Sequence, residues 1–108
     1  IAIGSIFNDA SATNSGYVRV FQYTNDQWGQ LGSDINGSAS NDNFGDAISL
    51  NGNGTVLAVG ATGHDIQVSG NIISNAGEVK VFKYINSTWT QLGADINAAF
   101  VYLFIMIS

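Results

Sequence analysis

His64 and Asp65 are the first residues to consider, because the one histidine of the chain stands directly before a carboxylate, with serines nearby. Such a group suggests hydrolase chemistry, in which a histidine activates a hydroxyl nucleophile and an acid orients the histidine. The chain, however, has no cysteine and no G-x-S-x-G turn to present a nucleophile. We therefore expect His64 to be a solvent-exposed loop residue, and we expect neither a catalytic residue nor an enzyme activity.

Other side chains that could bind a ligand belong to an internal repeat. The segment Gly16–Asn36 returns as Gly77–Asn97 sixty-one residues later with thirteen of twenty-one positions identical, so the chain is a repeat protein. Trp28 and Trp89 hold the same place in the repeat, each with a tyrosine opposite, which suits either sugar binding or hairpin packing. We expect packing. The candidate binding surface comprises Asn8, Asp9, His64, Asp65, Trp28 and Trp89.

Acidic residues recur in the repeat as well. Catalysis rarely needs the same residue in every unit, so we expect these acids to serve as turn or strand-end groups. The recurring pairs are Asp9 with Asp65 and Asp34 with Asp95. The two loops that differ between the units, Ile6–Ser15 and Thr62–Ala76, are therefore the better place for a functional surface.

Alternating polarity predicts the strands that hold these side chains. In Tyr17–Tyr23, for example, Val18 and Val20 face one side, and aromatic or charged residues face the other. Polar segments such as Thr24–Gln27 and Asn51–Gly54 predict tight turns between the strands. The expected strands are Ile1–Ser5, Tyr17–Tyr23, Trp28–Ile35, Asp46–Leu50, Val56–Gly60, Val79–Tyr84 and Trp89–Ile96.

Four antiparallel strands in a unit of this length predict an all-β fold of β-propeller blades. Residues 1–36 would form the last three strands of one blade and residues 37–97 a complete blade with its leading loop. The chain would thus hold about one and three-quarter blades of a larger propeller, with a β-sandwich as the alternative. Residues 98–108 do not follow the repeat, so we expect a truncation or frameshift there, or else a genuine terminal strand.

Composition excludes several classes of partner. The chain is 45% hydrophobic and 10% charged, with thirteen glycines and no proline, which suits short strands and tight turns. A net charge of −5 argues against nucleic-acid binding, because no basic patch is available to meet phosphates. The apolar run at residues 98–107 is shorter than the roughly twenty residues that a membrane span requires, so we expect no membrane span.

The segment FGDAISLNGNGTVLAVGA, with GYVRVFQY and WGQLGSDIN, resembles the FG-GAP repeat of integrin-α-type β-propellers. It is more similar still to a subset found in multi-repeat secreted surface proteins of Bacteroidetes. This resemblance covers nearly all of residues 1–97 and implies an extracellular or cell-surface propeller that serves adhesion or the binding of a protein or glycan. Its immediate partners would be neighbouring blades of the same chain. The alternatives are a non-catalytic blade portion of a propeller enzyme and a purely structural spacer array on the cell surface.

Some FG-GAP blades carry a calcium loop between their first two strands, and here that place is taken by Asn51–Thr55. Carboxylates supply most of the affinity of a calcium site, and these five residues include none. We therefore expect a glycine-rich hairpin turn, and no metal or other cofactor at this loop. The weak candidates for a metal ligand are Asn51, Asn53, Asp46 and Asp65, with Asp42 as a further helper that the spacing does not bring near the others.

Overall fold

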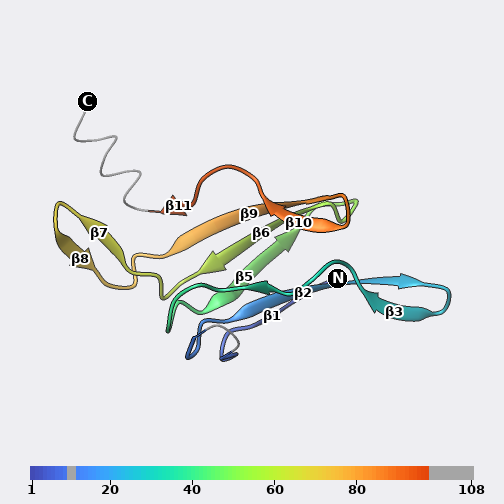
Figure 1. Cartoon of the computed structure of the whole chain (residues 1–108), viewed down its shortest axis with the longest axis horizontal. Helices are drawn as coiled ribbons and strands as arrows, with labels where there is room; N and C mark the ends of the chain where they lie inside the picture. Colours follow the sequence, from blue (N-terminus) through green and yellow to red (C-terminus); the bar gives the residue numbers. More distant parts are fainter. Residues whose placement is uncertain (10–11, 98–108) are drawn as a thin grey trace.

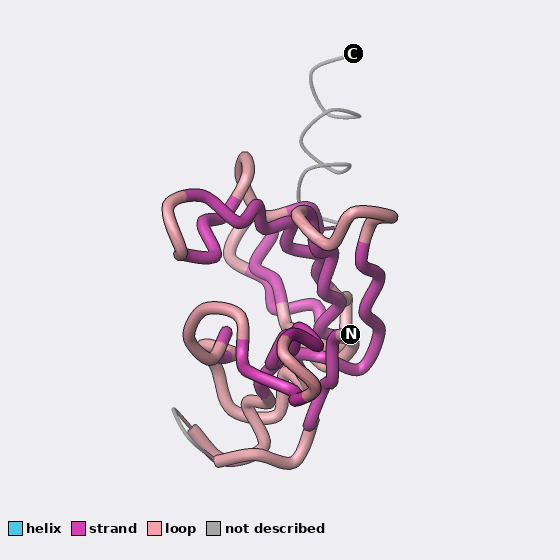
Figure 2. Tube along the Cα trace, turned by 90° about the vertical axis from the view of Figure 1, so that its right-hand side faces the viewer, coloured by secondary structure: helices cyan, strands magenta, loops and turns pink. Residues whose placement is uncertain are grey.

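The computed structural model describes residues 1–9 and 12–97, and in these residues the fold is all-β with antiparallel sheets and no helix (Figures 1 and 2). The expectations for residues 98–108 lie outside this range. We call residues 1–36 the first unit and residues 37–97 the second unit. The strands are β1 (Ala2–Ser5), β2 (Tyr17–Thr24), β3 (Gln27–Gln30), β4 (Ile35–Asn36), β5 (Phe44–Leu50), β6 (Val56–Ala61), β7 (Ile66–Val68), β8 (Asn71–Ile73), β9 (Glu78–Ile85), β10 (Thr88–Gln91) and β11 (Ile96–Asn97).

The second unit contains a four-stranded antiparallel meander in the order β10-β9-β6-β5, with the short β11 paired to β9. The first unit contains the corresponding β1-β2-β3, with β4 paired to β2. The expected four strands of a complete unit, and three of an incomplete one, are therefore confirmed as antiparallel sheets. Alternation explains the inward face, since Val18 and Val20 are buried while their neighbours in β2 are not.

The returning strand of each hairpin is shorter than expected. A single strand was predicted over Trp28–Ile35, but the structure breaks it into β3 and β4, and the matching strand into β10 and β11. Gly32 and Gly93 lie in these breaks with φ of 75° and 77°, a conformation that a regular strand does not adopt. The prediction of continuous strands was wrong for this reason.

The connection after β6 holds more structure than a plain loop. Within the expected surface loop Thr62–Ala76, β7 and β8 form a small hairpin that projects from the sheet (Figure 1). Ser69 and Gly70 at its tip both have positive φ, 52° and 81°, which matches the right-handed twist of a two-residue hairpin. Ile66 is buried at its base, whereas Ile72 is 65% exposed.

The two units share one hydrophobic cluster, which positions them against each other. Phe44 at the start of β5 packs edge-on against Phe82 of β9, with ring centroids 6.3 Å apart, and also joins the buried valines of the first unit. Its backbone N–H donates to the Ser15 carbonyl at 3.1 Å. The buried members of the cluster are Val18, Val20, Ile35, Phe44, Leu57, Val59, Ala61 and Phe82.

Glycines let the second unit approach the first unit at backbone distance. A Cβ built on Gly16 would lie 2.1 Å from the Phe44 carbonyl oxygen, and one on Gly4 would lie 2.2 Å from the Gly45 oxygen. Gly45 itself has a φ of 99° and sits at an irregularity in the pairing of β5 with β6. The Phe44-Gly45 pair therefore fits into a recess lined by Gly4 and Gly16 of the first unit, which we call the socket.

Candidate functional site

Asp42, His64 and Glu78 form a compact cluster at one end of the second unit's sheet. His64 Nδ1 lies 2.7 Å from Asp42 Oδ2, and His64 Nε2 lies 3.7 Å from Glu78 Oε1. One ligand atom from each of the three residues can be chosen so that all lie within 4.8 Å of one another. The two carboxylate side chains are 7% and 3% exposed and the imidazole 22%, so the group is largely shielded from water.

Three separate segments bring these side chains together. Asp42 lies in the loop before β5, His64 follows the end of β6, and Glu78 begins β9. Backbone bonds fix the meeting point, because the Gly63 N–H donates to the Asp42 carbonyl at 2.9 Å and the Gly77 N–H donates to the His64 carbonyl at 3.0 Å. A Cβ on Gly63 would lie 2.0 Å from the Asn41 oxygen, so only glycine permits this approach.

The charged side chains of Asp95 and Lys80 also lie near Glu78. Burial raises the pKa of the Glu78 carboxyl, a hydrogen bond with Asp95 raises it further, and electrostatic interactions with His64 and Lys80 oppose this shift. Asp95 accepts a 2.6 Å hydrogen bond from Gln91, which lowers the Asp95 pKa against an opposing effect of burial. The interaction between the two carboxyls therefore raises the pKa of Glu78 and lowers that of Asp95.

The structure corrects the expectation for His64. We expected a solvent-exposed loop residue, but the side chain is mostly buried between two carboxylates. Glu78 was not identified from the sequence at all, and Asp42 was only a helper with no assigned neighbour. A signal was present, because the second unit has His64 and Glu78 where the first unit has Asn8 and Tyr17.

The remaining acidic candidates have structural roles. The Asn14 N–H donates to Asp9 Oδ1 and the Asn75 N–H donates to Asp65 Oδ1, each at 2.8 Å, so both acids close equivalent loops. Asp46 accepts a 2.9 Å bond from the Thr62 hydroxyl. The strand-end pair behaves in the same way: Asp34 binds Arg19 and Gln30, and Asp95 binds Gln91 and lies 3.8 Å from Lys80. The predicted turn and strand-end roles are confirmed.

The Asn51–Thr55 loop is a hydrogen-bonded hairpin turn, as the sequence predicted. Asn51 Oδ1 accepts from the backbone N–H groups of Thr55 and Val56 at 2.8 and 2.9 Å. Asn53 Oδ1 accepts from the Thr55 hydroxyl at 2.6 Å and from its N–H at 3.3 Å. The amide oxygens that a calcium ion would need are thus engaged within the turn itself.

The two tryptophans pack with their tyrosines, as expected, but differ in their surroundings. Tyr23–Trp28 and Tyr84–Trp89 have ring centroids 5.2 and 5.1 Å apart. Trp28 is 60% exposed, whereas Trp89 packs against the shared hydrophobic cluster and donates from Nε1 to the Leu31 carbonyl at 2.9 Å. Trp89 therefore joins the second unit to the first.

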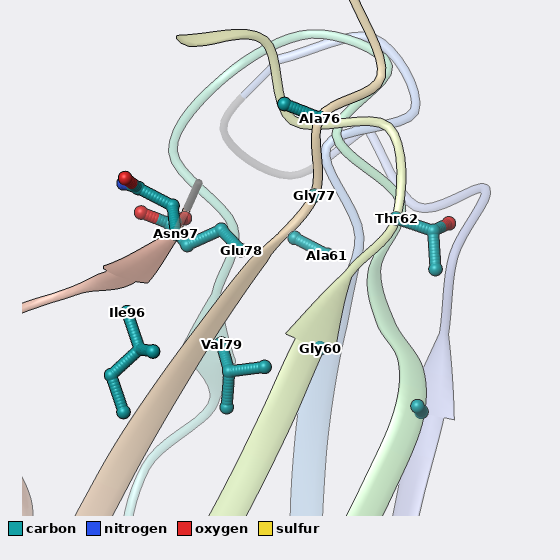
Figure 3. Close-up of a pocket in the computed structure, with 10 residues that line it drawn as sticks. Gly60, Ala61, Thr62, Ala76, Gly77, Glu78, Val79, Ile96 and Asn97 are labelled. Carbon is teal, nitrogen blue, oxygen red and sulfur yellow. The ribbon is translucent and has the colours of Figure 1, made fainter. Parts of the chain in front are cut away.

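An open pocket of about 390 Å³ beside Glu78 lies on the second unit's outer face (Figure 3). A Cβ on Gly77 at its rim would meet no heavy atom within 4 Å, in contrast to the crowded Gly16. The pocket-lining residues Gly60, Gly77, Val79, Ile96 and Asn97 hold the same repeat positions as Gly4, Gly16, Val18, Ile35 and Asn36 of the first unit.

Comparison with known proteins gave no assignment. No family model and no curated protein matches this chain. In the part of the chain that the structure describes, no helix is long and apolar enough to cross a membrane.

Proposed function

We propose that the chain is a non-enzymatic segment of an extracellular or cell-surface β-propeller of FG-GAP type. In this proposal, four-stranded blades stack on one another and carry loops that bind a protein or a glycan. One observation supports it above the others. The Phe44-Gly45 pair of the second unit sits in a glycine-lined socket of the first unit, and the second unit presents the same socket open.

The tryptophans support the same stacking arrangement. Trp89 lies over Gly32, where a Cβ would be 2.8 Å from its indole ring, and it bonds to Leu31. At the matching place on the second unit, Leu92 is 53% exposed and a Cβ on Gly93 would meet no heavy atom within 4 Å. A further blade would cover these residues with its own tryptophan.

The chemistry around His64 supports a non-enzymatic role. Within the described residues, both ring nitrogens face carboxylates, one from Asp42 and one from Glu78. General-base catalysis on a hydroxyl needs one ring nitrogen directed at that hydroxyl. The arrangement therefore suits charge neutralisation or ion binding better than activation of a nucleophile.

Extension of the chain by one unit tests the stacking. A second copy of residues 37–97 is inserted between Asn97 and Ala98, which preserves the natural Asn-Gly junction of the repeat. Because nearest-neighbour contacts stabilise repeat arrays, the extended chain should unfold in one transition at a higher urea midpoint than the parent. The matched control carries Phe44→Ala and Gly45→Val in the inserted copy only. Separate unfolding of the insert with an unchanged parent midpoint would contradict the proposal.

The binding role requires its own test. Residues 66–76 of the second unit are replaced by residues 10–15, the shorter connection of the first unit. A panel of immobilised glycans and matrix proteins is then probed with both chains. The proposal predicts a ligand that the parent binds and the replacement chain does not, at equal stability. Absence of binding by the parent would favour the structural spacer instead.

A further inference from the structure

We propose that His64 and Glu78 bind a zinc ion, with Asp42 orienting the imidazole from the opposite side. Imidazole nitrogen and carboxylate oxygen are both common zinc ligands. The inference concerns residues in which the second unit departs from the first, and it does not depend on the stacking of further units.

The distances show that Nδ1 of His64 is hydrogen-bonded to Asp42 and that Nε2 is not hydrogen-bonded to Glu78. The 2.7 Å separation between His64 Nδ1 and Asp42 Oδ2 is a short hydrogen bond, so Nδ1 donates and Nε2 keeps its lone pair for a metal. The 3.7 Å separation between Nε2 and Glu78 Oε1 exceeds a hydrogen bond. Two ligands at roughly 2.1 Å from zinc and at a tetrahedral angle lie about 3.4 Å apart, so a small side-chain rotation admits the ion.

The buried Asp42 carboxylate fixes the orientation of the His64 imidazole ring. Metal-binding histidines generally donate their second ring N–H to a carboxylate or carbonyl, which fixes the ring orientation and increases ligand basicity. Asp42 does this here from a position that is itself held by the Gly63 backbone bond. His64 is thus oriented before any ion arrives.

The charge balance also favours a cation. Asp42, Glu78 and Asp95 bring three carboxyl groups to this end of the sheet, and the basic groups near them are His64 and Lys80. Lys80 Nζ lies 3.8 Å from Asp95 Oδ1, so the positive charge of Lys80 is paired with Asp95. An ion between His64 and Glu78 would compensate the buried charge directly.

Solvent can reach the site and complete the coordination. Glu78 lines the open pocket beside the sheet, and Figure 3 shows it between Asn97 and Ala61. Two protein ligands leave room for water in the remaining positions of a tetrahedral zinc. The pocket therefore gives an ion and its waters a route to a carboxylate that is otherwise shielded.

Calorimetric titration of the untagged full chain with zinc chloride tests the proposal, with calcium chloride as the comparison ion. We expect one zinc bound per chain in the micromolar range and no comparable calcium binding. His64→Asn and Glu78→Gln should each abolish zinc binding, and Asp42→Asn should weaken it about 10- to 100-fold, as expected for the loss of an orienting carboxylate. His64→Asn introduces the residue that the first unit carries at this place, which favours retention of the fold.

The matched control is Asp65→Asn, which removes the neighbouring carboxylate but keeps an acceptor oxygen for the Asn75 N–H. It should bind zinc as the parent does. Visible absorption of the cobalt-loaded chain provides a second readout, with bands that His64→Asn removes. The proposal fails if the parent binds no zinc, if His64→Asn binds as well as the parent, or if Asp65→Asn loses binding to the same extent.

Discussion

Replacement of Trp89 by alanine should destabilise the chain far more than the same change at Trp28. Both residues occupy the same repeat position, and both stack on a tyrosine at nearly the same distance, 5.1 and 5.2 Å. The loss of this stacking, about 0.5–1.5 kcal/mol, is common to the two variants and cancels in the comparison. What remains is the contact of Trp89 with the first unit.

The magnitude follows from two contributions. The bond from Trp89 Nε1 to the Leu31 carbonyl contributes about 1 kcal/mol. Trp89 is partly buried whereas Trp28 is 60% exposed. If this difference is about a quarter of an indole surface of roughly 250 Å², it amounts to roughly 60 Å², or about 1.5 kcal/mol at about 25 cal/mol per Å². We therefore expect Trp89→Ala to lower the free energy of unfolding by about 2–3 kcal/mol more than Trp28→Ala does.

Urea denaturation followed by circular dichroism measures both variants against the parent, with the slope of the transition checked for equality. A difference of about 2–3 kcal/mol should be visible as a clear separation of the two midpoints. Equal destabilisation by the two substitutions would refute the reasoning, because it would mean that Trp89 gains nothing from the first unit.

Three further outcomes are expected. Gly16→Ala should lower the free energy of unfolding much more than Gly77→Ala. The two glycines have nearly equal φ (83° and 84°), so the backbone strain is the same, but only Gly16 lies against the β5 backbone. Similar thermal midpoints for the two variants would argue against the socket. The Arg19 guanidinium hydrogen bond lowers the Asp34 pKa below its usual 3.8, so this pair stabilises the fold above about pH 4 and is lost as the pH falls through the lowered pKa. Asp34→Asn should therefore flatten the stability profile below pH 4, and an unchanged profile would contradict this. Calorimetry should detect no calcium binding tighter than millimolar at Asn51–Thr55, and a micromolar site removed by Asn51→Ala would overturn that expectation.

The strands could be predicted because their information is local. Alternation in β2 identifies its buried face, Val18 and Val20, without knowledge of any neighbour. The repeat carries the strand itself over to β9 but not its buried face, because Val79, which matches Val18, is 39% exposed. Phe82 is buried against Phe44 instead. The continuous strand over Trp28–Ile35 was wrong because Gly32 takes a positive φ. Alternation alone does not report that conformation.

The cluster around His64 could not be predicted in the same way. Its burial depends on the loop before β5 folding over the end of β6, a contact that Gly63 permits through the absence of a side chain. A loop rich in polar residues favours the expectation of exposure, and only the tertiary contact reverses it. The first unit has different residues at the positions of His64 and Glu78, which draws attention to this site in the sequence. The difference does not say how close the two side chains lie in the fold.

Nuclear Overhauser spectroscopy of the labelled chain tests most directly whether the second unit docks on the first. The structure predicts cross-peaks between the Trp89 indole and Gly32, and between the Gly45 α-protons and the Val18 methyl groups, in addition to the Tyr23–Trp28 contacts within one hairpin. Both inter-unit cross-peaks should be lost together in Gly16→Val. Clear Tyr23–Trp28 cross-peaks with neither inter-unit contact in the parent chain would contradict the docking of the two units.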